Sequence, residues 1–145
     1  LFWEQMSIGR EFGHTIAETQ KLMDKIKSRG IPLRLLYDVD HGDLSSPDSR
    51  DTDPQAWLAA IGRECPIIHV KQSSANKGGH WPFVEPYNSN GRIQPAAIVS
   101  MLKQLGPEDC EICLELSFRE REPADRQAIA MMRESVAYWR PHIDS

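Results

Sequence analysis

Short hydrophobic runs alternate along the chain with amphipathic stretches, and this alternation is the strongest pattern in the sequence. Four runs have the length and composition of buried strands. These predicted strands cover residues 1–4, 33–37, 66–70 and 111–117. Each is followed by a loop and then by a segment whose apolar residues recur at helical spacing. These predicted helices cover residues 15–29, 53–62, 94–106 and 123–141. The pattern therefore predicts four consecutive strand–helix units.

Local signals mark where several of these helices begin and end. Thr15 followed three residues later by Glu18 is a capping-box pattern at the start of the first helix. Gly30 stands where a left-handed residue would end that helix. Asp53 followed by Pro54 is typical of an N-cap and a first helical position.

The last predicted helix begins at Pro123, and we expect Pro141 to end it, because proline lacks the N–H that a helix interior requires. Its apolar residues fall on one face. They are Ile129, Met132, Val136 and Trp139.

Strands that alternate with helices of this length indicate a parallel sheet with right-handed crossovers. Ligands of such sheets bind at the carboxyl ends of the strands. Each predicted strand carries a polar residue at or near that end. These residues are Glu4, Asp38, His69 and Glu115. Carboxylates combined with one imidazole suit a divalent ion such as Mn²⁺, Mg²⁺, Co²⁺ or Zn²⁺.

Simpler explanations exist for each residue taken alone. A single acid at a strand end is often a helix cap or a solvated loop residue. His69 could equally be a hydrogen-bonded core histidine. Asp38 and Asp40 share a strand face by parity, so they compete for one ligand position.

Composition narrows the class of protein. The chain has 145 residues, 40% of them hydrophobic, which suffices for one domain with a core. It holds 17 basic and 21 acidic residues, a net charge of −4, and no basic stripe typical of nucleic-acid binding. No apolar run approaches the roughly 20 residues of a membrane span, and no signal-peptide pattern is present. These features predict a cytoplasmic protein with small-molecule partners, neither nucleic acid nor membrane.

Cys65, Cys110 and Cys113 are an odd set without the spacing of a zinc site. We expect them to be small buried hydrophobic residues.

The order of the polar residues resembles a known family. The chain carries Glu4 and Glu11, then Asp38-x-x-His41, then His69 followed by a long loop containing His80, then Glu115. This order resembles the second half of the xylose isomerase-like sugar isomerases and epimerases, and within that family the tetrulose-phosphate racemase type. The resemblance covers the whole chain. It implies a TIM (β/α)₈ barrel in which residues 1–145 are the C-terminal half, strands five to eight with their helices, of one barrel domain.

The resemblance also implies roles for individual residues. One divalent metal ion would bind Glu4, Asp38, His69 and Glu115, and the two glutamates would also shuttle the proton. His41 would contact the substrate. Gln72 departs from the family, which usually has an aspartate three residues after the histidine ligand.

Such a site would abstract a proton beside a ketose carbonyl and pass through an enediolate, whose charge a metal ion stabilises. Basic residues near the strand ends could hold a phosphate, although ordinary solvated loop charge is the alternative. The expected substrate contacts are Glu11, His41, Lys71, His80, Arg119 and Arg121, with Lys77 a further nearby cation. A metal-dependent hydrolase or lyase resembling abasic-site endonucleases and a non-catalytic sugar-binding domain stay as alternative functions.

Four strand–helix units would leave two open sheet edges and a bare inner face. We therefore expect an N-terminal half-barrel, in the same or another chain, as a partner that shares the substrate pocket. Homo-oligomerisation stays open.

Overall fold

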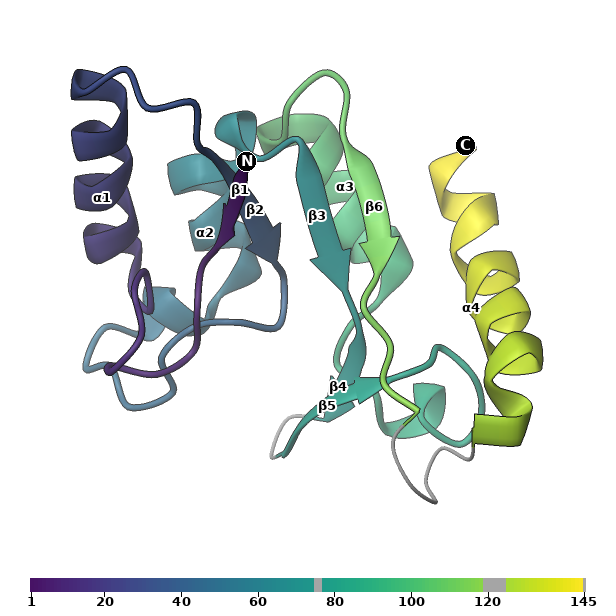
Figure 1. Cartoon of the computed structure of the whole chain (residues 1–145). Helices are drawn as coiled ribbons and strands as arrows, with labels where there is room; N and C mark the ends of the chain where they lie inside the picture. Colours follow the sequence, from purple (N-terminus) through teal and green to yellow (C-terminus); the bar gives the residue numbers. More distant parts are fainter. Residues whose placement is uncertain (75–76, 119–124, 145) are drawn as a thin grey trace. The chain divides into compact units, whose positions relative to one another are not determined.

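The structure is a computed structural model, and it describes residues 1–74, 77–118 and 125–144 (Figure 1). Contacts divide the chain into two compact units. The first unit comprises Leu1–His69 and Met101–Ile112, and the second comprises Val70–Ser100 and Cys113–Ser145. Each unit is described by itself below.

Four strands form one sheet in the order β1-β2-β3-β6. Their bounds are β1 Phe2–Glu4, β2 Arg34–Asp38, β3 Ile67–Val70 and β6 Glu111–Leu114. β1 pairs parallel with β2, and β2 pairs parallel with β3. The four strands fall within the four predicted ranges or extend them by one residue. The predicted parallel sheet is therefore confirmed.

Four α-helices follow these strands in the predicted places. Their bounds are α1 Ile16–Ser28, α2 Pro54–Ile61, α3 Pro95–Leu105 and α4 Ala128–Ile143. Short 3₁₀ turns stand at η1 Ser49–Thr52, η2 Gly62–Glu64, η3 Asn88–Asn90 and η4 Asp125–Gln127. In the described ranges no helix has both the length and the apolar character that crossing a membrane requires.

The predicted helix caps are present in the first unit. Thr15 Oγ1 accepts from the Glu18 N–H at 3.2 Å, and Asp53 Oδ1 accepts from the Gln55 N–H at 3.0 Å. Gly30 has a φ of 62°, in the left-handed region that glycine adopts without strain. Local sequence therefore sets the ends of these helices.

The core of the first unit lies between β2 and α2. Leu35 and Tyr37 of β2 and Trp57 and Leu58 of α2 are fully or almost fully buried. The Tyr37 and Trp57 rings stack with their centroids 6.0 Å apart. The Trp57 indole donates to the Asp51 carbonyl at 2.7 Å, so its one polar atom is satisfied.

β1 departs from the expectation of a buried strand. Leu1 is 88% exposed and Phe2 is 44% exposed. The reason is the sheet order, because β1 is an edge strand with β2 as its one neighbour. Phe2 therefore has a neighbouring strand on one side, whereas Trp3 lies beside Leu22 and Ile26 of α1 and is partly buried.

Phe83 anchors α4 in the second unit. The Phe83 ring meets Trp139 edge-on at 5.1 Å and stacks on Tyr138 at 6.2 Å. The Phe83 N–H donates to Ser135 Oγ at 2.9 Å, and that hydroxyl donates to the Met131 carbonyl at 2.7 Å. The Ser135 and Trp139 face of the helix is thus the buried one.

The four apolar residues of the predicted face are not buried together. Ile129, Met132 and Val136 are 68%, 49% and 43% exposed, whereas Trp139 is buried. Helical spacing identified an apolar stripe, but the packing of Phe83 selects a neighbouring face.

Pro141 does not end α4, which continues to Ile143. A proline in the last turn removes one N–H donor, and the Asp144 N–H still donates to the Arg140 carbonyl at 3.1 Å. The expected start at Pro123 lies outside the described residues.

The cysteines are in three different environments. Cys65 is buried, Cys110 is intermediate and Cys113 is exposed, so the expectation of burial holds for Cys65 alone. Alternation along β6 places Glu111 and Cys113 on its exposed face. Burial raises the pKa of Cys65 to about 12, which makes its thiol unreactive near neutral pH.

The long segment from Gln72 to Arg92 contains regular secondary structure in its described residues. It contains an antiparallel hairpin of β4 Gln72–Ser74 and β5 Lys77–Trp81, followed by η3. The Gln72 side chain bonds to Ile93, just beyond the end of this segment. Gln72 Oε1 accepts from the Ile93 N–H at 3.0 Å, and the Gln72 amide donates to the Ile93 carbonyl at 3.1 Å. Gln72 thus serves as a structural residue here.

Candidate active site

Three of the predicted metal ligands lie together in the first unit. Glu4, Asp38 and His69 stand at or near the carboxyl ends of β1, β2 and β3, and in the register of the sheet Asp38 is level with His69. Each offers one ligand atom, and these atoms lie within 4.8 Å of one another. Glu4 Oε1 is 3.4 Å from His69 Nδ1. Parallel strands that end at one edge thus bring together residues far apart in sequence.

The Glu4 carboxylate has the environment of a metal ligand. Its Oε1 atom is shielded from solvent and accepts no hydrogen bond within the described part of the chain. A buried carboxylate oxygen without a hydrogen bond is costly unless a cation compensates it. Two carboxylates and an imidazole are a donor set that divalent ions accept. The residues therefore fit the predicted divalent ion.

Asp38, and not Asp40, is the aspartate in this group. The Asp38 side chain is fully buried, and its Oδ1 accepts from the Asp40 N–H at 2.8 Å. The Asp40 carboxylate is not in the ligand group found among the described residues. The backbone of Asp40 therefore orients the carboxylate of Asp38.

Gln5 is a site residue that the sequence pattern did not identify. Its buried side chain bonds both backbone groups of Asp38: the amide donates to the Asp38 carbonyl at 2.8 Å, and the Asp38 N–H donates to Gln5 Oε1 at 3.0 Å. These bonds extend the β1–β2 pairing past the strand ends. The one available signal was its position directly after Glu4.

His41 is held beside the same group. Its Nδ1 lies 2.8 Å from the Gln5 carbonyl oxygen, and because a carbonyl only accepts, Nδ1 carries the proton in this contact. His41 Nε2 lies 4.0 Å from Asp38 Oδ2. The ring thus presents Nε2 toward the acidic side of the group.

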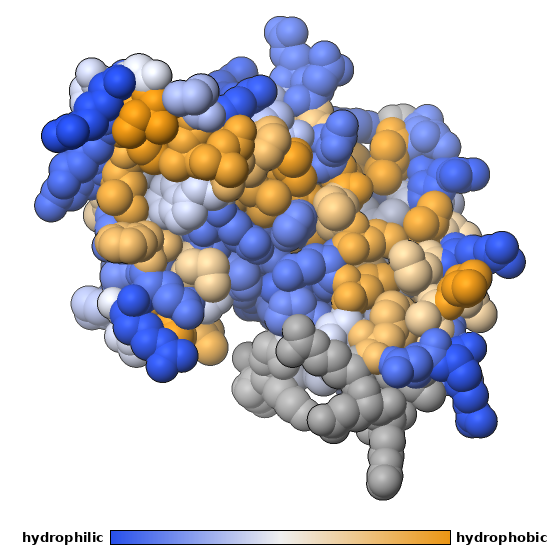
Figure 2. Space-filling view, in the orientation of Figure 1, coloured by the Kyte–Doolittle hydropathy of each residue, from blue (hydrophilic) through white to orange (hydrophobic). Residues whose placement is uncertain are grey.

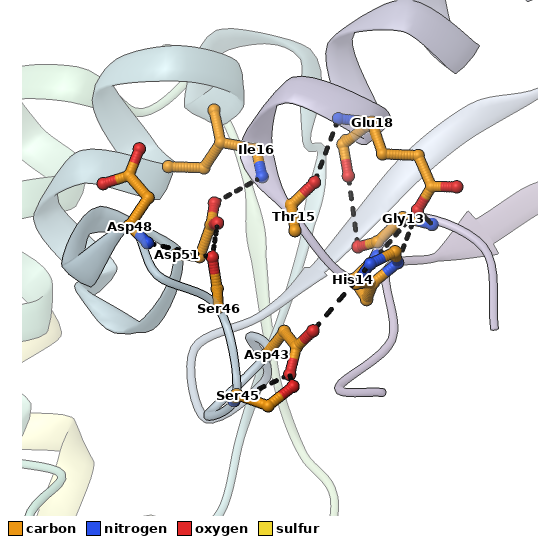
Figure 3. Close-up of polar contacts among 11 residues, drawn as sticks. Gly13, His14, Thr15, Ile16, Glu18, Asp43, Ser45, Ser46, Asp48 and Asp51 are labelled. Carbon is orange, nitrogen blue, oxygen red and sulfur yellow. Dashed lines mark hydrogen bonds and ion pairs between the residues drawn. The ribbon is translucent and has the colours of Figure 1, made fainter. Parts of the chain in front are cut away.

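Figure 3 shows a polar network that joins the loops after β1 and β2. His14 Nδ1 lies 2.7 Å from Glu18 Oε2, and His14 Nε2 lies 3.8 Å from Asp43 Oδ2. The Asp43 N–H also donates to the His14 carbonyl at 3.0 Å. Hydrogen bonds from the Ser45 hydroxyl and N–H lower the pKa of Asp43. This network steadies the two loops that carry Glu11 and His41.

Asp51 makes a second connection between these loops and the helices (Figure 3). Asp51 Oδ1 accepts from the Ile16 N–H at 2.8 Å, and Oδ2 accepts from the Ser46 hydroxyl at 2.6 Å. Gly42 passes so close that an added Cβ would lie 1.9 Å from the Asp51 carbonyl oxygen, and its φ is 147°. Only glycine fits there.

Glu115, the fourth predicted ligand, belongs to the second unit. It follows β6 directly, and its N–H donates to the Val70 carbonyl at 3.0 Å. Lys71 Nζ donates to Glu115 Oε2 at 2.8 Å, and His80 Nε2 lies 3.5 Å from Glu115 Oε1. The second unit thus gathers three predicted site residues, Lys71, His80 and Glu115.

The remaining predicted contacts are Glu11, Arg119 and Arg121, with Lys77 as a further nearby cation. Glu11 lies in the turn after β1, where its N–H donates to the Ile8 carbonyl at 2.9 Å, and its carboxylate is outside the ligand group of the described residues. Arg119 and Arg121 lie outside the described residues, as does the side chain of Lys77.

A solved structure identifies the fold. The chain is similar to a crystal structure from Rhodospirillum rubrum ATCC 11170 whose protein has the provisional name xylose isomerase, with a TM-score of 0.72. The match covers 97% of this chain and 46% of that one at 23% sequence identity, which is evidence for the fold alone. The chain therefore has the xylose isomerase-like TIM-barrel fold over about half a barrel, as predicted.

A curated relative narrows the resemblance further. The chain is 52% identical over 147 residues to the D-erythrulose 1-phosphate 3-epimerase of Brucella abortus (strain 2308). The match includes 100% of this chain and 47% of the relative, in its C-terminal part, so the chain spans about half the relative's length. No protein-family model matches the sequence. The predicted resemblance to xylose isomerase-like epimerases is confirmed.

Proposed function

We propose that this chain supplies the metal-binding half of the active site of a sugar-phosphate epimerase or isomerase. The observation that carries the proposal is the convergence of Glu4, Asp38 and His69 at one sheet edge. The 52% identity to an epimerase of erythrulose 1-phosphate supports a short ketose phosphate as substrate. The enzyme class follows from these two together.

One divalent ion would be held by Glu4, Asp38 and His69, with Glu115 as the fourth ligand. When bound, such an ion stabilises the enediolate that forms after proton loss beside the carbonyl. The Glu115 N–H donates to the carbonyl of Val70, which directly follows His69 in the chain. The position of Glu115 directly after β6 and the resemblance in residue order support Glu115 as the fourth ligand.

The protein's own residues would move the proton. A glutamate on each face of the substrate removes and returns it, and Glu4 and Glu115 are the two carboxylates suited to these roles. Return to the opposite face inverts the carbon, whereas return to the neighbouring carbon isomerises the sugar. His41, whose Nδ1 is occupied by the Gln5 carbonyl, would contact a substrate hydroxyl through Nε2.

The phosphate would be held by Arg119 and Arg121, which follow Glu115 closely in sequence. Arginine presents a planar fork of donors that matches phosphate oxygens. Glu11 and His80 would contact the sugar. A cytoplasmic location stays a prediction from composition.

An N-terminal half-barrel is the proposed partner. Figure 2 shows apolar surface where α1 and β1 lie in the first unit. Leu1, Phe2 and Phe12 of this unit are exposed, and Phe12 lies beside Trp3 of β1 and Leu22 of α1. The relative is about twice as long as this chain, so its N-terminal half would supply the neighbouring strand. Pairing with that strand would give hydrogen-bond partners to the backbone N–H and C=O groups on the outer edge of β1.

Metal titration tests the centre of this proposal. Calorimetry with Mn²⁺ should find one ion per chain, and the Asp38→Asn and His69→Gln variants should each weaken binding by more than about tenfold. Asp24→Asn on the exposed surface of α1 is the matched control. If Asp40→Asn weakened Mn²⁺ binding and Asp38→Asn did not, the ligand role would pass to Asp40. Binding of several ions per chain would favour the hydrolase alternative.

Activity requires a completed barrel. Joining this chain to the N-terminal half of the Brucella epimerase should give a protein that exchanges the C3 proton of erythrulose 1-phosphate with deuterated water, as observed by NMR. Glu115→Gln should abolish this exchange with the fold intact. Unchanged exchange in that variant would remove Glu115 from the mechanism.

A further inference from the structure

Lys71 is a buried lysine in the second unit, with 2% of its side chain exposed. Lysine is seldom buried, because removing an ammonium group from water is costly unless a counter-charge compensates it. The following residue, Gln72, and the preceding one, Val70, are also buried. The backbone therefore holds the base of the Lys71 side chain in place.

The ammonium group of Lys71 contacts the side chains of Glu115 and His80. It donates to Glu115 Oε2 at 2.8 Å and lies 3.2 Å from His80 Nε2. Because an ammonium group has no acceptor, His80 Nε2 is the acceptor in that contact, and the neutral ring then carries its proton on Nδ1. Lys71 thus links β5 of the hairpin to the residue that follows β6.

The hairpin supports this arrangement through its backbone. The Ser117 N–H donates to the His80 carbonyl at 2.8 Å, two residues beyond Glu115. His80 Nε2 also lies 3.5 Å from Glu115 Oε1. The segment that carries Glu115 is therefore attached to the hairpin at both a backbone and a side-chain position.

We propose that Lys71 is a positioning residue for Glu115, and not a ligand of the substrate phosphate. The hydrogen bond to Oε2 restrains the rotation of the Glu115 carboxylate and so sets the direction in which its Oε1 points. That this orientation serves metal binding and proton transfer rests on the proposed function. A phosphate group brought to Lys71 would also approach the negative charge of Glu115. A lysine that binds phosphate instead needs an accessible ammonium group.

Kinetics of the completed barrel distinguish the two roles. In Lys71→Met, kcat for proton exchange should fall by about 100-fold, a typical cost of misplacing a proton-transfer group, with KM for erythrulose 1-phosphate changed less than about threefold. Lys71→Arg, which keeps the charge, should recover part of the loss. Lys21→Met on the exposed face of α1 is the control. A large rise in KM with kcat retained would overturn the proposal in favour of phosphate binding.

Crystal structures of the wild type and of Lys71→Met give a readout that does not depend on activity. In the variant, the Glu115 carboxylate should rotate or become disordered. An unchanged carboxylate would overturn the proposal. If the wild-type barrel shows no exchange, the proposed function fails, and the position of Glu115 in these two structures still decides the role of Lys71. If Lys71→Met does not fold, the structure of Lys71→Gln answers the same question.

Discussion

At the scale of single residues, the candidate site depends on one glutamine as much as on its acids. Gln5 bonds the N–H and the carbonyl of Asp38 through its side chain and holds His41 through its own carbonyl. The residue that directly follows β1 thereby sets the position of a proposed ligand and of a proposed substrate contact. Comparable support of metal ligands by neighbouring hydrogen bonds strongly affects metal affinity.

We expect Gln5→Leu to destabilise the chain by about 1–3 kcal/mol, because it leaves two buried backbone groups of Asp38 without their partners. Urea denaturation would measure this change. The variant should also weaken Mn²⁺ binding. Gln20→Leu, at an exposed position of α1, is the control, and equal stability of the two variants would contradict the role given to Gln5.

The ligand residues were predictable because their chemistry shows in the sequence at the strand ends. Glu4, Asp38 and His69 each follow or end an apolar run, and runs of this kind form parallel strands that end together. Gln5 was not predictable, since an amide side chain has no preferred partner until the backbone around it is placed. The contacts of Lys71 depend in the same way on a hairpin far along the chain.

At the scale of elements, Gln72 of β4 connects the hairpin to the segment that follows η3 through hydrogen bonds of its side chain. The Gln72 side chain bonds both backbone groups of Ile93, and its amide also donates to Asn88 Oδ1 at 3.2 Å. Gly91 passes directly beside it, where an added Cβ would lie 2.1 Å from Gln72 Cδ. The glycine is thus required for close approach.

Gly91→Ala should therefore force Gln72 from its place and destabilise the chain by about 1–3 kcal/mol, the usual cost of overpacking a buried site. Thermal and chemical denaturation would detect the change. Gly9→Ala, whose added Cβ would have its nearest atom at 3.7 Å, is the control. A Gly91→Ala variant as stable as wild type would show that Gln72 can move without cost.

Helix ends were predicted well where local signals set them. The buried face of α4 could not be predicted, because tertiary packing determines it. Thr15, Gly30 and Asp53 act on backbone groups a few residues away, so the ends of α1 and the start of α2 follow from sequence. The buried face of α4 depends on Phe83, about fifty positions earlier in the chain. Periodicity alone could not choose between the Ser135 face and the Met132 face.

At the scale of the whole molecule, each unit has apolar surface that its own residues leave uncovered. In the first unit, Phe12 is 71% exposed and lies at a pocket of about 220 Å³ with Trp3, Leu22 and Ile26. In the second unit, Ile129, Met132 and Val136 of α4 are exposed. Contiguous apolar surface of this kind marks interaction sites.

If the N-terminal half-barrel covers this surface, it should bind the separate chain. Mixing this chain with the N-terminal half of the Brucella epimerase should give a one-to-one complex by size-exclusion chromatography with light scattering. Phe12→Asp should weaken the complex by more than about tenfold, because it places a charge against an apolar partner. Leu44→Asp, at an exposed position in the loop after β2, is the control. A chain that forms only its own dimer would instead assign the apolar surface to a second copy, since two copies could also cover the exposed edge of β1.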